Sequence, residues 1–182
     1  SDDKTLEVVN DFSKKLSTHH TLQTATSQRG ISKQRNAGAR IATHDTLLFC
    51  DADVYVPNPK HFQTMLEDFV TRDIDIATAK IIPLEKTLRP SLIHAAANTV
   101  ARVLLWKKRA YFGGAFQIIK RSTFEKVGGY DEALRVSEDV ELSCRISKIG
   151  TSKIYRTKIA VSTRRFQKYG YSWIYNNRGD MY

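Results

Sequence analysis

The stretch that decides the fold is Asp45-Thr-Leu-Leu-Phe-Cys-Asp-Ala-Asp53. Its apolar run, residues 47–50, ends abruptly in two carboxylates that stand one residue apart. A short apolar run of this kind predicts a buried strand of a parallel sheet. Ligands of open α/β sheets bind just beyond the carboxyl ends of the strands. We therefore expect Asp51 and Asp53 to lie at the mouth of a cleft.

The two aspartates also predict a metal site. Side chains two residues apart on an extended backbone point to the same side. Carboxylate oxygens of Asp51 and Asp53 would suit Mg²⁺ or Mn²⁺ carrying a phosphate-bearing substrate. Asp-x-Asp is a common pair, however, and a merely polar strand end is the alternative explanation.

Composition narrows the class of protein. A chain of 182 residues is long enough for one domain with a hydrophobic core. Its formal net charge of +10 favours anionic partners, namely nucleic acid, phosphorylated substrates or an anionic membrane surface. No stretch reaches the length of a membrane-spanning helix. Two cysteines do not suggest a disulfide framework, which favours a reducing compartment such as the cytoplasm.

Periodicity and turn residues predict an α/β domain with a mixed sheet. Helices are expected from residue 5 to about 16 and over residues 32–42, 60–70, 91–107, 122–127 and 138–149, with Ser32 as the N-cap of the second. Strands are expected over residues 21–26, 47–50, 74–82, 116–120, 153–155 and 159–162. The last two strands would form a hairpin-like tail.

A second acidic cluster, Glu138-Asp139-x-Glu141, opens the last expected helix. The helix dipole and free backbone N–H groups explain acids at this position without any chemistry. A carboxylate there could equally act as a general base on a hydroxyl. The glycine pair just upstream, residues 128–129, fits the wall of an active site. Both explanations remain open at this point.

Other sequence signals are less specific. Arg164 and Arg165 precede an aromatic-rich segment, which could bind nucleic acid, lie on a membrane surface or bind a diphosphate. The five histidines lack metal-ligand spacing. Gly113 and Gly114 lack the spacing of a dinucleotide fingerprint, and no phosphate-binding loop of the Walker type is present. Nothing suggests a Ser-His-Asp or Cys-His nucleophile.

Four segments in order resemble family 2 glycosyltransferases of the GT-A fold. Residues 32–42 resemble the family's arginine-asparagine-x-glycine helix, and residues 47–53 its strand ending in Asp-x-Asp. Residues 114–132 resemble its acceptor-side segment, and residues 137–145 its Glu-Asp helix. Each motif is weak alone, but four in order with suitable spacing are specific. The resemblance implies a Rossmann-like mixed sheet flanked by helices.

The resemblance also implies that the chain, residues 1–182, is a single glycosyltransferase domain in fragment form. Ser1-Asp-Asp-Lys-Thr5 aligns best with the end of the family's Asp-Asp-Gly-Ser-x-Asp-Gly-Thr segment. The family's first two strands would then lie before residue 1, and a C-terminal region would be absent as well. Arg164-Arg165 stands where cellulose and chitin synthases have Gln-x-x-Arg-Trp, which disfavours a processive polymerase.

Site residues follow from the resemblance. Asp139 would be the catalytic base of an inverting transfer, and Asp53, assisted by Asp51, would hold Mg²⁺ or Mn²⁺. The other assignments are donor binding by Arg35, Asn36, Asp51, Arg164 and Arg165, and acceptor binding by Gly113, Gly114 and Glu138.

The resemblance also implies partners and a location. The expected donor is a nucleotide-diphosphate sugar, and the expected acceptor is a glycan, a lipid-linked carrier or another hydroxyl compound of cell-envelope synthesis. Peripheral contact with an anionic membrane at the cytoplasmic face is expected, and nucleic acid is not. Two alternatives remain open: a metal-dependent nucleotidyltransferase, and a non-catalytic basic module that binds nucleic acid or anionic membrane.

Overall fold

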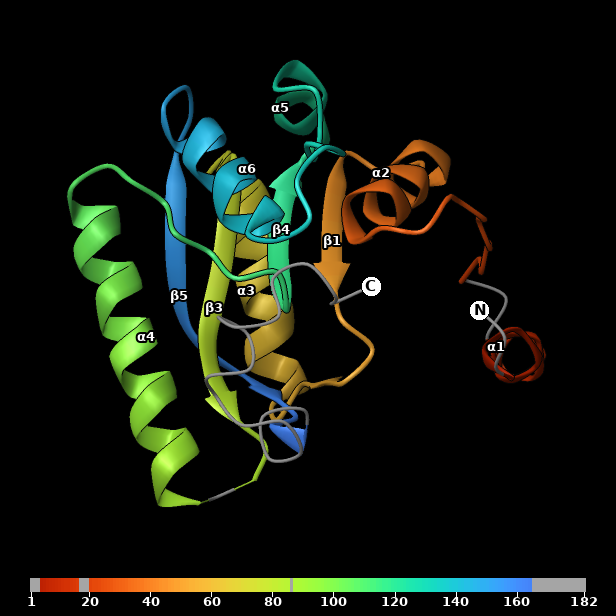
Figure 1. Cartoon of the computed structure of the whole chain (residues 1–182), viewed down its shortest axis with the longest axis horizontal. Coiled ribbons are helices and arrows are strands. Elements are labelled where there is room, and N and C mark those ends of the chain that lie inside the picture. The colour runs from red at the N-terminus through yellow and green to blue at the C-terminus, as the bar shows by residue number, and fades with distance from the viewer. Residues whose placement is uncertain (1–3, 17–19, 86, 165–182) are drawn as a thin grey trace.

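A computed structural model describes residues 4–16, 20–85 and 87–164, apart from the side chain of Leu6. Within these ranges the chain forms a mixed α/β fold, as predicted (Figure 1). The helices are α1 (Thr5–Ser13), α2 (Ile31–Ile41), α3 (Pro59–Thr71), α4 (Leu88–Trp106), α5 (Arg121–Lys126) and α6 (Glu138–Ser147). The strands are β1 (Thr46–Cys50), β2 (Val54–Tyr55), β3 (Ile76–Pro83), β4 (Phe116–Lys120) and β5 (Ser152–Val161).

The sheet is mixed, with the strand order β1-β4-β3-β5-β2. β4 runs antiparallel to both β1 and β3, whereas β3 and β5 run parallel. β2 pairs antiparallel with the last residues of β5. The two strands that follow one another around the Asp-Ala-Asp motif therefore lie at opposite edges of the sheet.

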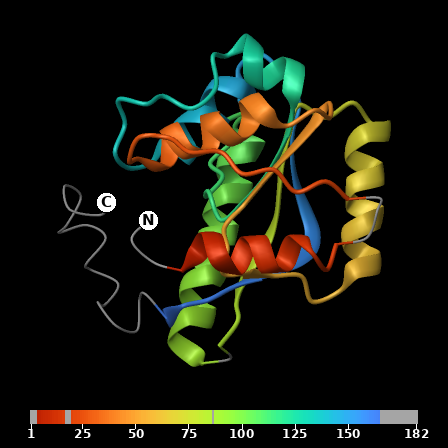
Figure 2. The ribbon, with the colours of Figure 1, turned by 90° about the vertical axis from the view of Figure 1, so that its right-hand side faces the viewer.

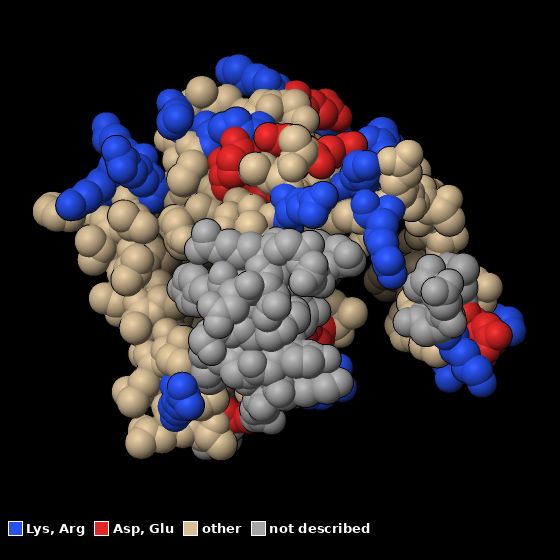
Figure 3. All heavy atoms as spheres, in the orientation of Figure 1, with Lys and Arg blue, Asp and Glu red and all other residues tan. Residues whose placement is uncertain are grey.

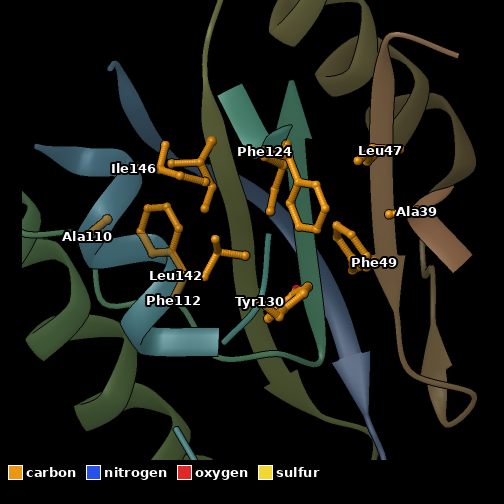
Figure 4. Packing of buried hydrophobic residues seen from close by; sticks show 11 residues of the cluster. Ala39, Leu47, Phe49, Ala110, Phe112, Phe124, Tyr130, Leu142 and Ile146 are labelled. Carbon is orange, nitrogen blue, oxygen red and sulfur yellow. The ribbon is translucent and has the colours of Figure 1, made fainter. Parts of the chain in front are cut away.

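Apolar side chains cover both faces of the sheet. One cluster joins β1 and β4 to α2, α5 and α6 around Phe49, Phe124 and Tyr130 (Figure 4). The Phe49 ring meets the Tyr130 ring edge-on, with 5.1 Å between centroids. The other cluster packs Met65 and Phe69 of α3 against the opposite face. Figure 2 shows α3 on one side of the sheet and α2 on the other, so the domain has three layers.

β1 is an edge strand, which corrects the prediction of a buried parallel strand. Its pairing with β4 is antiparallel, and among the described residues its other edge has no partner strand. Burial alternates along it, because Leu47 and Phe49 enter the core whereas Leu48 is 42% exposed. An apolar run does not reveal the direction of its neighbour, so the sequence could not distinguish these arrangements.

The Asp-Ala-Asp motif lies in a turn, not on extended backbone. The Val54 N–H donates to the Asp51 carbonyl over 3.2 Å, and the chain turns from β1 towards β2. The expectation that Asp51 and Asp53 point to the same side because of strand geometry is therefore wrong.

Three further local predictions are wrong. Residues 21–26 form no strand, and α2 begins at Ile31 with Gly30, not Ser32, as its N-cap. Ser32 is instead buried in the first turn of the helix. The expected hairpin-like tail is the single strand β5, whose register against β3 shifts between Thr78 and Lys80. The polar residues Arg156 and Thr157 lie between the paired positions Ile154 and Lys158, which explains why the pattern resembled two strands.

Within the described ranges, no helix combines the length and apolarity that crossing a bilayer requires.

Arg121, at the start of α5, forms hydrogen bonds to the end of α2 and the segment after it. Its removal should destabilise the fold. Its guanidinium donates to the carbonyls of Ala39, Ala42 and His44 over 3.1, 2.6 and 2.8 Å. Arg121→Met keeps the alkyl chain but leaves these carbonyls without that donor, which should lower the free energy of unfolding by about 1–3 kcal/mol. Urea unfolding measures the change. The control Arg40→Met, at an exposed position of α2, should alter stability by less than about 0.5 kcal/mol.

Candidate active site

The site forms where the turn after β1 meets the segment before β4 and the start of α6. Cys50, the last residue of β1, pairs with Phe116, the first residue of β4. The next residue, Asp51, donates its N–H to the Ala115 carbonyl over 3.1 Å. On the other side of the turn, the Ser162 N–H donates to the Asp53 carbonyl over 3.3 Å. The turn thus spans from the beginning of β4 to the end of β5. The two backbone hydrogen bonds at its ends position both aspartates.

Arg35 of α2 joins the two acidic clusters. Its guanidinium donates to Asp51 Oδ1 over 3.0 Å, to Glu138 Oε1 over 3.1 Å and to the Gly114 carbonyl over 3.0 Å. The side chain is only 13% exposed. The guanidinium carbon also lies 5.3 Å from the centre of the Tyr130 ring, within the range of a cation–π contact. One cation therefore holds the carboxylates of Asp51 and Glu138 together.

Asp139 stands at the first turn of α6 and is held by backbone donors. The Gly114 N–H donates to Oδ2, and the Val140 N–H donates to Oδ1 over 2.7 Å. Burial raises the pKa of Asp139 above that of an ordinary aspartate, although these two N–H groups and Arg35 oppose the change. A more basic carboxylate in a fixed orientation has the properties of a general base.

Glu138 is more deeply buried than Asp139 and is a partner of Arg35. Its side chain is 8% exposed. Burial raises the pKa of Glu138, and the neighbouring Asp139 carboxylate raises it further, whereas Arg35 lowers it. Ser137, which precedes it, has a φ of 62°, in the left-handed region that costs energy for a residue with a side chain. Such strain at a start of a helix is often found at functional sites.

Glu141, the third acid of this cluster, has a structural partner. Its carboxylate pairs with Arg145 one turn later over 2.5 Å. Arg145 in turn donates to the carbonyl of Gly129 over 2.8 Å. Glu141 therefore has a structural role, whereas Glu138 accepts from Arg35 and Asp139 accepts from the Gly114 N–H.

Gly114 and Gly113 differ sharply in their surroundings. A Cβ on Gly114 would lie 2.7 Å from the Arg35 guanidinium nitrogens and 3.0 Å from Asp139 Oδ2. A Cβ on Gly113 would meet no atom within 4 Å. Gly114 is therefore required by the protein's own side chains. The acceptor-binding role of both glycines stays a prediction.

Asn36 is engaged within the protein. Its amide donates to the Tyr130 carbonyl over 2.9 Å and to Glu132 Oε1 over 2.9 Å, and its Oδ1 accepts from the Tyr130 N–H over 3.0 Å. These contacts fix the loop that carries Tyr130. Both side chains thus make their contacts within the protein, and the donor-binding roles of Asn36 and Arg35 stay predictions.

Asp51 and Asp53 offer carboxylate oxygens that fit a hard divalent ion. Asp51 gives one oxygen to Arg35, and its side chain is 48% exposed. Asp53 is exposed, and among the described residues its carboxylate makes no hydrogen bond or ion pair. No group of three or more candidate ligands occurs within the described residues. Two carboxylates suit an ion that takes its other ligands from water and substrate phosphates, as Mg²⁺ commonly does.

Hydrogen bonds to Glu85 hold the residues after β5 in place beside this turn. Glu85 accepts from the Thr163 N–H over 2.8 Å, the Thr163 hydroxyl over 2.7 Å and the Ser162 hydroxyl over 3.1 Å. The bonds from Thr163, and then the one from Ser162, lower the pKa of Glu85 to about 2. Arg164 follows and is exposed. Arg165 and the aromatic segment after it lie outside the described residues.

A cleft runs along the edge of β1 that has no partner strand among the described residues. It has a volume of about 910 Å³, and Arg35 and Asp51 lie in its wall together with Leu48. Asp53 and Asp139 do not line it. The cleft therefore reaches Arg35 and Asp51, whereas Asp139 lies outside its lining.

Two residues that sequence reasoning missed support Asp139. Gln117 of β4 is fully buried and donates to the carbonyls of Phe112 and Asp139 over 2.9 and 3.2 Å. The Tyr130 hydroxyl donates to Gln117 Oε1 over 2.9 Å. The single amide within the apolar run Phe116-Gln-Ile-Ile was the signal, because a buried amide requires partners.

Comparison with known proteins agrees with this fold. The model of the family described as glycosyl transferase family 2 matches residues 1–128. The chain therefore belongs to glycosyltransferase family 2.

Two curated relatives are called pre-mycofactocin glycosyltransferase, from the Mycobacterium tuberculosis strains CDC 1551 / Oshkosh and ATCC 25618 / H37Rv. Each is 26% identical over 134 residues, which make up 70% of this chain and 28% of the relative. The chain thus spans less than a third of the length of these relatives.

Two solved structures share the GT-A fold. The mannosyltransferase PcManGT from Pyrobaculum calidifontis, in complex with GDP-Man and Mn²⁺, has a TM-score of 0.64 at 20% identity and covers 88% of this chain and 44% of its own. TarS 1-349 of S. aureus has a TM-score of 0.61 at 18% identity and covers 90% of this chain and 49% of its own. The expected fold class is confirmed.

Gly114→Ala should destabilise the site, whereas Gly113→Ala should not. The added methyl group would displace the Arg35 guanidinium from its carboxylates, so we expect a loss of about 1–3 kcal/mol in the free energy of unfolding. Gly113→Ala, with open space around its Cβ, should change stability by less than about 0.5 kcal/mol. Chemical unfolding of both variants measures the difference. Equal effects would show that Gly114 does not serve this close approach.

Arg35→Met should raise the pKa values of Glu138 and Asp139. The guanidinium lowers both pKa values in the native protein, because it stabilises the charged carboxylates. Carbon-13 NMR titration of the labelled carboxyl groups measures the change. Arg35→Lys keeps the charge and should give a smaller increase. Unchanged pKa values in Arg35→Met would contradict the assigned contacts.

Proposed function

We propose that the chain contains the catalytic site of an inverting glycosyltransferase. The reaction transfers a sugar from a nucleotide-diphosphate donor to an acceptor hydroxyl. The observation that carries the proposal is the placement of Asp139. Arg35 contacts Asp51, in the turn that also bears Asp53, and Glu138, the neighbour of Asp139, so one guanidinium links the two acidic clusters.

Asp139 takes the proton of the attacking hydroxyl in this proposal. Each of its oxygens accepts one backbone N–H bond, which fixes the carboxylate and leaves a second lone pair for the proton. Its raised pKa favours that transfer over one to an ordinary aspartate. Attack by the hydroxyl on the side opposite the departing diphosphate inverts the anomeric centre.

Asp53 holds the divalent ion, Mg²⁺ or Mn²⁺, with Asp51 in support. When bound, the ion acts as a Lewis acid that stabilises the charge of the departing nucleotide diphosphate. Asp53 is the stronger candidate for direct ligation, since its carboxylate is exposed and Asp51 gives an oxygen to Arg35. PcManGT, which has the same fold, was solved with GDP-Man and Mn²⁺.

The remaining residues orient the two substrates. Glu138 and the backbone at Gly113 and Gly114 lie on the acceptor side, and Glu138 shapes the site through Arg35. Asn36 holds the loop of Tyr130 against α2 on the donor side. Arg164 and Arg165 neutralise the donor diphosphate or a phosphate of the acceptor.

The biological setting belongs to the same proposal. The acceptor is a glycan or lipid-linked carrier of cell-envelope synthesis, used at the cytoplasmic face of a membrane. The net charge of +10 supports a location beside anionic lipid headgroups.

Variants of the two aspartates test the proposal separately. Asp53→Ala should abolish metal-dependent binding of the donor, because it removes the direct ligand. Asp139→Asn should keep donor binding but reduce the transfer rate by about 10²–10⁴. Isothermal titration with Mn²⁺ and nucleotide sugars measures binding, and release of nucleoside diphosphate measures transfer. The control Asp45→Asn, at the exposed opposite end of β1, should behave as wild type.

Near-normal turnover of Asp139→Asn would refute the assignment of the base. Release of pyrophosphate from a nucleoside triphosphate, in place of nucleoside diphosphate from a nucleotide sugar, would identify a nucleotidyltransferase instead.

A further inference from the structure

α4 has an unusual distribution of apolar residues. It packs on the sheet through its inner side, where the Asn98 amide donates to the Ile81 carbonyl over 2.6 Å and its Oδ1 accepts from the Ile81 N–H over 3.1 Å. Of its 19 residues only Pro90 is fully buried. A helix on a protein surface normally turns charged and polar residues outwards. α4 instead presents an apolar stripe to solvent.

The stripe follows helical spacing along the whole element. Its members recur every three or four residues: Leu88, Leu92, Ala96, Thr99, Val103 and Trp106. Leu88, Leu92, Val103 and Trp106 are 77, 61, 49 and 85% exposed. The Thr99 hydroxyl donates to the Ala95 carbonyl within the helix, so it does not require water. At about 1.5 Å per residue the stripe is about 28 Å long.

The charges carried by α4 and the turn after it are all positive. Residues 88–109 contain no aspartate or glutamate, and five are lysine or arginine. Arg102, Lys107, Lys108 and Arg109 are exposed, and none takes part in an ion pair among the described residues. Figure 3 shows Lys and Arg spheres gathered at the upper end of α4 and mostly uncharged surface along the rest of that flank.

We propose that α4 docks lengthwise on an anionic lipid surface. Its apolar stripe enters the headgroup region, and the basic end, residues 107–109, contacts the lipid phosphates. An exposed apolar face with basic flanks is the physical signature of an interfacial helix. Trp106, beside the basic end, is suited to the boundary between headgroups and acyl chains. A second copy of the chain fits less well, because its α4 would bring like charges and no acids to the contact.

The docked helix would bring the reaction centre close to the lipid. The chain leaves Trp106 through the basic end and reaches Gly114, whose N–H holds Asp139. This places the acceptor side of the site near the headgroups. In this respect the inference deepens the proposed membrane setting, whereas the docking itself rests on the surface of α4 alone.

Vesicle sedimentation of the full chain tests the docking. Binding to phosphatidylcholine vesicles that contain phosphatidylglycerol is expected, with weaker binding at high salt and to phosphatidylcholine alone. Leu92→Glu should weaken binding at least about 10-fold, because it puts a carboxylate into the apolar contact. Val70→Glu makes the same change at a 64% exposed position of α3 and should bind like wild type.

Trp106 provides a second readout that does not depend on Leu92→Glu folding. The chain has two tryptophans, Trp106 and Trp173, so Trp173→Phe leaves Trp106 as the single emitter. Its fluorescence should shift to shorter wavelength when anionic vesicles are added. Replacing Lys107 and Lys108 by glutamate should weaken this shift.

Two results would overturn the proposal. One is unchanged vesicle binding by folded Leu92→Glu together with an unchanged Trp106 spectrum. The other is lipid-free association of the chain that requires Leu92, without vesicle binding, which would make α4 an interface between copies. The assay contains no donor, metal ion or turnover, so Asp139→Asn should bind vesicles like wild type. Failure of the transfer reaction and failure of docking are therefore distinguishable.

Discussion

The structure of the site depends on one cation held among carboxylates. Arg35 joins α2 to Asp51, 16 residues away, and to Glu138, 103 residues away. Removing one partner of such a pair leaves a charge in a poorly solvated position, which is costly. Helix α2, the turn after β1 and the start of α6 must therefore keep their relative positions. Gly114 permits this arrangement, because a side chain there would occupy the place of the guanidinium.

A chain of buried polar groups lies beneath this cation. Asn36 clasps the backbone of Tyr130, the Tyr130 hydroxyl donates to Gln117, and Gln117 donates to the Asp139 carbonyl. Buried polar groups in a low-dielectric interior strongly favour the one arrangement that pairs them. These hydrogen bonds connect α2, β4 and α6, so rigid elements hold the carboxylate of Asp139 in place. Such support is what a precisely oriented base requires.

The site and the surface of α4 differ in the sign of their charged groups. The interior of the site collects carboxylates around one arginine, and burial raises the pKa values of Glu138 and Asp139. The flank formed by α4 carries only basic and uncharged residues. The segment between α4 and β4 connects these two regions and ends beside Asp139. The proposed donor site and the proposed lipid-binding surface can thus be adjacent without sharing residues.

The sequence alone determined the class of fold, most helices and the place of both acidic clusters, because periodicity, glycine turns and acids at helix starts are local signals. Only the tertiary structure showed that β1 is an edge strand antiparallel to β4. It also showed that β5 is one strand and not two. An apolar run carries no information on the direction of the strand beside it. In β5, polar residues at an irregularity interrupt the apolar pattern of a single strand. The partners of Arg35 were equally hidden. Their contacts exist only because sheet pairing brings segments far apart in the chain to one point, where burial makes a charge require its counter-charge.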